Sequence, residues 1–347
     1  MQRILPFVLA LLLPGLLSQP ALCAPNTNSN PLSMRYTVTD LGTLPGCDSA
    51  VATGINDNGV VVGVALINGN FDRRAAFVWR EGKILPLPPP EEGDSYAHAI
   101  NNRGDIVGFG GRSETDWRPL LWQAGKKKPP VRLSEKPGQA LALNAKGQVL
   151  VKDTDGLRLW PQRNPLIIPP PEGKFVRLSG LNDRGDIIGI FARSGAEFSP
   201  TVAEEPFLYH AGKLSLLGTL GGKRSVCTDI NSAGDIIGWA EDPQRQRHAC
   251  LWKEGALQEL PMEGAIGAEA SAINSVGVIV GRFSTHAAGM RACLWWSGQG
   301  VDLNTRIPAA SGWTLHYASG INRRGQIIGS GFYNGSQRAF LLTPLKK

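Results

Sequence analysis

Five side chains of this 347-residue sequence could take part in acid–base chemistry on a sugar: Glu269, Asp229, His98, His316 and Tyr317. Glycoside hydrolysis needs two carboxyl groups on either side of the scissile bond, and a lyase needs a proton-transferring set such as Tyr, His and Arg. The five lie far apart in the sequence, so they could act together only if the fold brings them within about 10 Å of one another. A glycan hydrolase or lyase is therefore one hypothesis.

Linear motifs of catalysis or cofactor binding are missing from the sequence. There is no His or Cys cluster with metal-ligand spacing, no G-x-S-x-G and no phosphate-binding loop. Residues 152–156 begin like a calcium loop but lack its later Glu, so we interpret them as a solvated turn. We therefore assign no catalytic residue and expect no metal and no cofactor.

A second group of residues suits binding rather than catalysis. Loops on a rigid scaffold often carry function, and aromatic rings mixed with charges suit a sugar or protein surface. The candidate binding residues in the variable loops and at the strand ends are Tyr96, Trp117, Arg224, Trp313, His316 and Tyr333. They predict a binding or scaffolding surface without catalysis.

The elements that position these residues come from a repeated unit, Ile-Asn-x-x-Gly-x-Ile-x-Gly, which recurs seven times at intervals of 38 to 49 residues. Asn caps a turn with its side chain and Gly accepts a positive φ, so both are predicted to be structural turn residues of a hairpin and no ligand cage. The Asn residues are Asn56, Asn101, Asn144, Asn182, Asn231, Asn274 and Asn322, and the Gly residues are Gly59, Gly104, Gly147, Gly185, Gly234, Gly277 and Gly325.

Each repeat holds four short apolar strands and no amphipathic helical window, which is typical of the blades of a β-propeller. The chain ends soon after the last third strand, whereas the strand-like residues 36–44 precede the first Asn. We therefore predict an all-β, seven-bladed β-propeller of four-stranded blades over residues 36–347, with the N-terminal strand completing the last blade. The third repeat has Val151 in place of Gly and Arg158 in place of an apolar residue, so its blade is expected to be distorted.

The N-terminal region predicts export. Arg3, the apolar run 4–17 and the Ala-Leu-Cys at 21–23 resemble a signal peptide over residues 1–23, and that run is too short to cross a bilayer. We expect a flexible segment over 24–35 and a monomeric mature chain, without a transmembrane segment, in the periplasm or outside the cell.

The mature chain keeps four cysteines: Cys47, Cys227, Cys250 and Cys293. Cys250 and Cys293 hold the same position in consecutive repeats, which places them too far apart to be bridged. We predict buried free thiols.

The net charge of +7 is scattered, and the run of lysines at 126–128 is interpreted as a solvated loop. An exported protein is not expected to bind nucleic acid, whereas attraction to acidic glycans or envelope lipids fits the charge.

The residues at 39–46, 55–63 and 248–252 resemble the bacterial extracellular HAF-repeat proteins. The resemblance covers nearly the whole mature chain and implies a secreted, propeller-like repeat protein of unassigned activity, with no catalytic residues to carry over. The His of the motif stands only at His248, while Arg118, Arg291 and Arg338 occupy three of the matching places.

The sequence thus predicts a secreted, noncatalytic binding or scaffolding propeller that recognises a glycan or an envelope or extracellular protein through its loop face. Two alternatives stay open. One is a hydrolase or lyase with its site at the mouth of the central channel, and the other is a purely structural repeat protein that binds no ligand.

Overall fold

The computed structural model describes residues 30–67, 70–90, 93–126, 128–162, 165–193 and 203–345. The signal peptide predicted for residues 1–23 lies outside these ranges, as do residues 24–29 of the segment expected to be flexible. Residues 30–35 include a 3-10 turn, η1 (Pro31–Ser33), and Leu32 and Met34 pack against the core between the last two blades. No helix in the described ranges is long and apolar enough to cross a membrane.

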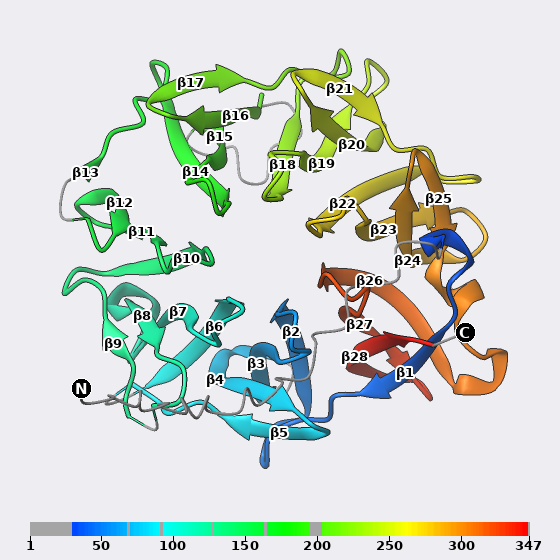
Figure 1. Ribbon diagram of the computed structural model, residues 1–347, viewed down its shortest axis with the longest axis horizontal. Coiled ribbons are helices and arrows are strands. Elements are labelled where there is room, and N and C mark those ends of the chain that lie inside the picture. Colours follow the sequence, from blue (N-terminus) through cyan, green and yellow to red (C-terminus); the bar gives the residue numbers. More distant parts are fainter. Residues whose placement is uncertain are drawn as a thin grey trace, which may run out of the picture.

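Seven antiparallel sheets of four strands each stand in a ring, which confirms the predicted seven-bladed propeller (Figure 1). The innermost strands of blades 1 to 7 are β2 (Ser49–Ile55), β6 (Asp94–Ile100), β10 (Gly138–Leu143), β14 (Lys174–Leu181), β18 (Ser225–Ile230), β22 (Gly267–Ile273) and β26 (Trp313–Ile321). The second strands are β3 (Val61–Ile67), β7 (Ile106–Gly111), β11 (Val149–Asp153), β15 (Ile187–Arg193), β19 (Ile236–Glu241), β23 (Ile279–Thr285) and β27 (Ile327–Tyr333).

The third strands are β4 (Asn70–Arg80), β8 (Arg118–Trp122), β12 (Gly156–Trp160), β16 (Glu205–His210), β20 (Arg247–Lys253), β24 (Gly289–Trp296) and β28 (Ser336–Pro344). The outer strands of blades 1 to 6 are β5 (Lys83–Pro86), β9 (Val131–Arg132), β13 (Pro165–Leu166), β17 (Lys213–Leu216), β21 (Ala256–Glu259) and β25 (Gln299–Asp302). Further 3-10 turns are η2 (Glu114–Asp116), η4 (Leu303–Arg306) and η5 (Ala309–Ser311).

The two ends of the described chain meet in blade 7. Strand β1 (Tyr36–Asp40) pairs antiparallel with β28, from Tyr36 opposite Pro344 to Asp40 opposite Phe340. The sheet order β1-β28-β27-β26 makes β1 the outer strand of the last blade, as predicted. Strand β1 lies next to β28, which comes about 300 residues later in the chain (Figure 1). It thereby supplies the fourth strand of blade 7 and closes the ring.

Within a blade, the second and third strands approach each other closely at one cross-strand pair. In blade 1, Gly63 lies opposite Phe77, and a Cβ on Gly63 would fall 2.0 Å from the Val51 carbonyl oxygen and 2.8 Å from the Phe77 ring. Blade 3 has Val151 opposite Arg158 at this place. It still forms four strands, although its outer strand β13 has only two residues.

The seven Asn side chains form a closed ring of hydrogen bonds. Each Asn is 3 to 6 % exposed, and its side-chain Nδ2 donates to the main-chain carbonyl of the next Asn along the ring, at 2.9 to 3.4 Å. The last of these bonds runs from Asn322 to Asn56 and so joins blade 7 to blade 1. The same side chains keep local bonds, as where Asn274 Oδ1 accepts from the N–H groups of Val276 and Val278.

The glycines three residues after each Asn all have positive φ, between 75° and 93°. Their main-chain N–H groups donate to the Asn carbonyls at 3.0 to 3.1 Å, which closes each turn. Two of them also lie under an arginine of the preceding blade: a Cβ on Gly147 would fall 2.1 Å from Arg103 Nη2, and one on Gly234 would fall 1.9 Å from Arg184 Nη2. At Gly147 and Gly234 a side chain is therefore excluded twice, by the positive φ of the turn and by the close approach of the arginine from the preceding blade.

We predict that Asn274→Ala lowers the free energy of unfolding by about 2–4 kcal/mol, because it removes the bond to the Asn322 carbonyl between blades and leaves the N–H groups of Val276 and Val278 without a partner. Denaturant unfolding measures this. Asn58→Ala is the control, since Asn58 is exposed and donates only a long 3.4 Å bond, so its change should stay within about 0.5 kcal/mol. Equal effects of the two variants would contradict a role for the ring.

Candidate functional site

The two faces of the ring differ in their loops. One face, here called the lower face, carries the Asn turns, and the opposite upper face carries the connections into the inner strands and the hairpins between second and third strands. The six candidate binding residues lie toward the upper face, in the first halves of inner strands, at the end of a second strand or in the adjoining loops: Tyr96, Trp117, Arg224, Trp313, His316 and Tyr333.

Blade 2 brings two of the candidates together in a row of aromatic rings, here called the aromatic row. Tyr96 stacks on its cross-strand neighbour Phe109, with ring centroids 4.9 Å apart, and Phe109 contacts Trp117 at 4.8 Å. The guanidinium of Arg74 from blade 1 lies 4.7 Å from the centre of the Trp117 ring. Burial, with a smaller contribution from Tyr317, raises the pKa of Tyr96, while Arg74 opposes this, so the phenol is protonated at neutral pH.

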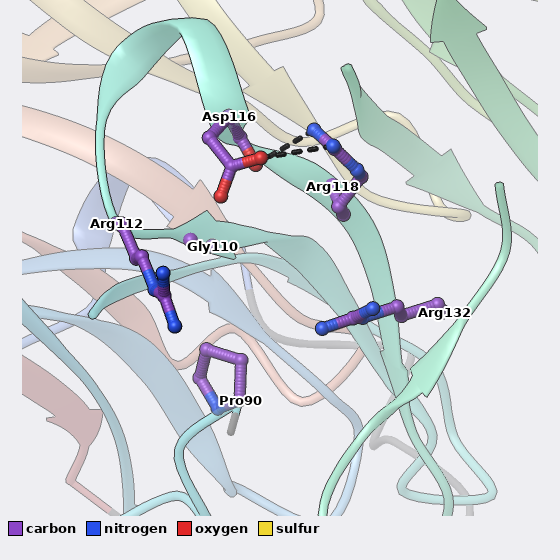
Figure 2. Close-up of a pocket in the computed structure, with 7 residues that line it drawn as sticks. Pro90, Gly110, Arg112, Asp116, Arg118 and Arg132 are labelled. Atoms are coloured by element: carbon purple, nitrogen blue, oxygen red, sulfur yellow. Dashed lines mark hydrogen bonds and ion pairs between the residues drawn. The ribbon is translucent and has the colours of Figure 1, made fainter. Parts of the chain in front are cut away.

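A pocket of about 270 Å³ includes Asp116 and Arg118, the residues on either side of Trp117 in the chain. Figure 2 shows the residues that line it. Arg112, Asp116, Arg118 and Arg132 line it, together with Pro90 and the main chain at Gly110. Arg118 is held by Asp116 through two contacts, Nη2 to the carboxylate at 2.9 Å and Nη1 to the carbonyl oxygen at 2.8 Å. Three guanidinium groups around one small volume suit a carboxylate, a sulfate or paired sugar hydroxyls.

Blades 4 to 6 carry two Arg–Glu–Arg clusters, here together called the Arg–Glu belt, formed by Arg177, Glu204 and Arg224 and by Arg247, Glu269 and Arg282. Glu204 bridges Arg177 at 3.3 Å and Arg224 at 2.7 Å, and Glu269 bridges Arg247 at 2.7 Å and Arg282 at 2.5 Å.

Aromatic rings join the two halves of the belt and extend it to blade 7. Trp239 lies 5.4 Å from the Arg224 guanidinium and 4.4 Å from that of Arg247, and Arg282 lies 5.5 Å from the Tyr317 ring. The belt therefore crosses blades 4 to 6 through ion pairs and cation–π contacts and reaches blade 7 at Tyr317, and these contacts hold its arginines in place.

The remaining candidates lie on blade 7. Trp313 stacks on Tyr333 with centroids 5.2 Å apart, and His316 contacts Phe332 at 5.0 Å. Phe332 and Tyr333 are 39 % and 36 % exposed, so both rings are accessible from solvent. Burial and the nearby Arg291 lower the pKa of His316, which keeps its ring neutral at pH 7.

The two carboxylates considered for catalysis are bound to internal partners. Glu269 lies between Arg247 and Arg282 in the belt, with Tyr317 beyond Arg282. Asp229 stands two residues before the Asn231 turn and accepts hydrogen bonds from the N–H groups of Ile230 at 2.8 Å and Ile273 at 2.9 Å. It therefore links blade 5 to blade 6.

The last of the catalytic candidates, His98, lies beside Tyr96 in β6, with ring centroids 6.1 Å apart. Burial lowers the pKa of His98. Within the described residues, no three His, Cys, Asp or Glu side chains lie close enough to hold a metal ion.

Sequence reasoning missed several residues that complete these groups: Arg74, Phe109, Glu204, Trp239 and Arg282. The strand register contains a signal for three of them. The fifth residue before each Asn lies opposite a residue of the second strand, and these pairs include Tyr96 with Phe109, Val226 with Trp239, and Glu269 with Arg282. Aligning those two positions across the repeats would have found them.

No family model and no curated protein matches the chain. Among solved structures, it is similar to a puromycin-hydrolyzing peptidase of Mycobacterium tuberculosis, at 11% identity over 86% of this chain and 53% of that chain, with a TM-score of 0.51. It is also similar to a chain of the mitotic checkpoint complex, at 12% identity over 100% of this chain and 99% of that chain, with a TM-score of 0.53. The protein spans about half the length of the peptidase, and at these identities the likeness shows the propeller fold alone.

Asp229 predicts a pH effect on stability. Burial raises the pKa of its carboxyl from 3.8 to about 6, so the folded state binds the proton more tightly than the unfolded state. The free energy of unfolding should therefore fall as pH rises from about 4 to about 6. Asp229→Asn keeps an oxygen acceptor for the Ile273 N–H without the charge.

Because the amide has one oxygen, the variant loses the bond from the Ile230 N–H at every pH. We nevertheless expect the Tm of Asp229→Asn relative to that of the native protein to be several degrees higher at pH about 7.5 than at pH about 4, where the native carboxyl is protonated in the folded state. Thermal unfolding followed by circular dichroism at the two pH values measures this. A Tm difference that does not change with pH would contradict the raised pKa.

Proposed function

We propose that the protein is a noncatalytic binding propeller that recognises an acidic glycan through its upper face. The observation that carries the proposal is the aromatic row of Tyr96, Phe109 and Trp117 beside the pocket lined by Arg112, Arg118 and Arg132. Aromatic rings pack on the C–H faces of sugars, and guanidinium groups pair with carboxylates or sulfates. The combination fits a sugar chain that carries acidic groups.

Charge and location support this proposal. The net charge of +7 attracts polyanions over distances of about a Debye length and should raise the rate of encounter. The resemblance to extracellular HAF-repeat proteins and the signal peptide expected over residues 1–23 support a location at the cell envelope or outside the cell, where acidic polysaccharides are available.

The arrangement of carboxylates favours binding over hydrolysis. Glu269 is neutralised by two arginines, and Asp229 accepts hydrogen bonds from two main-chain N–H groups. Asp229 bonds to the N–H of Ile273, four residues and about 13 Å along β22 from Glu269, whereas the two carboxyl groups of a glycosidase lie within about 10 Å of each other. The belt that contains Glu269 therefore supplies fixed charges rather than a proton donor and a base.

We predict that the protein from Ala24 to Lys347 binds polygalacturonate saturably, binds neutral dextran weakly or not at all, and loses affinity between about 20 and 200 mM salt. Trp117→Ala and Arg118→Ala should each weaken binding by about tenfold, since each removes a direct contact. Arg324→Ala is the charge-matched control, because Arg324 is exposed on the lower face. Calorimetric titration measures all four proteins.

Product analysis of the same mixtures separates the alternatives. Shortening of the polysaccharide would make the protein an enzyme and overturn the noncatalytic proposal. Equal weakening of binding by Arg324→Ala and Arg118→Ala would show that the interaction depends only on net charge and that the pocket is not the binding site. A lack of saturable binding across acidic and neutral polysaccharides would refute glycan recognition and favour a protein partner or a purely structural role.

A further inference from the structure

Blade 3 departs from the other six blades at one cross-strand pair. In those six blades a glycine of the second strand lies opposite a fully buried apolar side chain of the third strand: Gly63 and Phe77, Gly108 and Leu120, Gly189 and Phe207, Gly238 and Cys250, Gly281 and Cys293, and Gly329 and Phe340. In blade 3 the pair is Val151 and Arg158. Blade 3 thus has a valine where the other blades have glycine, and a cation where they have a buried apolar side chain.

This exchange leaves a space between blades 2 and 3. A cavity of about 500 Å³ is lined by Leu133 from blade 2 and by Val151, Arg158, Trp160, Pro161 and Gln162 from blade 3. In other blades the third-strand side chain is buried in the core between blades, as Phe77 is, whereas the Arg158 side chain is 30 % exposed and turns to Asp153. The volume lies within the range of small-molecule sites in proteins.

The guanidinium of Arg158 is fixed at the wall of this cavity by one nitrogen. Its Nη2 contacts Asp153 at 2.7 Å and Asp155 at 3.5 Å. The Asp153 side chain is itself completely buried and also accepts from Ser134 Oγ at 2.6 Å and from the Asp155 N–H at 2.9 Å. Within the described residues, Nε and Nη1 of Arg158 have no hydrogen-bond partner, so the N–H groups of these two nitrogens stay available on a guanidinium that is held in place by Nη2.

The other walls are largely apolar. Leu133, Val151 and Pro161 present aliphatic surface, Trp160 adds an indole ring, and the exposed Gln162 lies at the solvent side. A space of this size, with aliphatic and indole walls on one part and available N–H groups of a cation on another, matches a flat apolar molecule that carries a single anionic group. A fully hydrophilic sugar would leave its hydroxyl groups without partners against these walls.

We propose that the cavity between blades 2 and 3 binds an aromatic carboxylate, with its rings against Trp160 and Leu133 and its carboxylate accepting from an available N–H of Arg158, on Nε or Nη1. The cavity shares no lining residue with the pocket on blade 2. The proposal therefore stands independently of glycan recognition at the upper face.

The test is calorimetric titration of the protein from Ala24 to Lys347 with 2-naphthoate and, as the neutral isostere, 2-naphthamide. We expect one saturable naphthoate site per chain and an affinity for the amide that is lower by about tenfold or more, because the amide cannot form the charge-assisted pair. Absence of saturable naphthoate binding, or equal affinities for the two compounds, would overturn the proposal.

Arg158→Leu copies the Leu120 of blade 2 and should lower the naphthoate affinity to that of the amide while leaving amide binding unchanged. Because this change also removes a partner of Asp153, Trp160→Leu provides a second variant that keeps the ion pair intact, and it should weaken both compounds by about tenfold.

The variant V151G/R158F rebuilds the glycine and phenylalanine pair of blades 1, 4 and 7 and should abolish binding by filling the cavity. Trp117→Ala on the upper face is the control and should bind naphthoate unchanged. Naphthoate affinity that survives in both Trp160→Leu and V151G/R158F would place the ligand elsewhere and refute the site.

Discussion

The propeller depends on one repeated interaction, the donation of each buried Asn side chain to the main-chain carbonyl of the next Asn. Because the seven bonds form a closed ring, each turn on the lower face must lie at the same spacing from the next, although the repeats differ in length from 38 to 49 residues. The differences in length are therefore accommodated away from the Asn turns, in the connections on the upper face and at the outer strands. A fixed lower face and a variable upper face follow from the same constraint, and this explains why the aromatic row, the arginine pocket and the Arg–Glu belt are all found on one side.

Much of this architecture was predictable because its signals are local. Asn and Gly three residues apart describe a turn by themselves, four short strands per repeat describe a blade, and a spare strand at residues 36–44 indicates closure of the ring. The bond between neighbouring Asn residues was not predictable in the same way, since the side chain that caps its own turn gives no sign that its Nδ2 reaches another blade. The candidate site was predictable only in part for the same reason. Tyr96 and Trp117 could be assigned to one face from the repeat, but ion pairs such as Arg247 with Glu269 join different blades, and no spacing in the sequence predicts such a pair.

The buried position of the third strand shows how the repeat tolerates variation in its core. Phe, Leu and Cys all occupy it, opposite a glycine whose missing side chain leaves room for the largest of them. Cys250 and Cys293 are therefore packing residues, and burial raises the pKa of Cys250 to about 12, which keeps its thiol protonated. All four cysteines of the described chain are free; three are buried as predicted, and Cys47 is partly exposed.

Blade 3 can differ from the others because its loss of core packing leaves the ring intact. Asn144 still donates to the Asn182 carbonyl at 3.1 Å and still accepts from Asn101 through its own carbonyl at 3.3 Å. The blade is thus held in place on the lower face by bonds that do not involve Val151 or Arg158. A propeller stabilised by a distributed ring of polar contacts can give up the apolar filling of one blade at a local cost, and the space that results is available for a ligand. In a protein whose only stabilisation came from the apolar core between blades, the same two substitutions would weaken the closure of the whole ring.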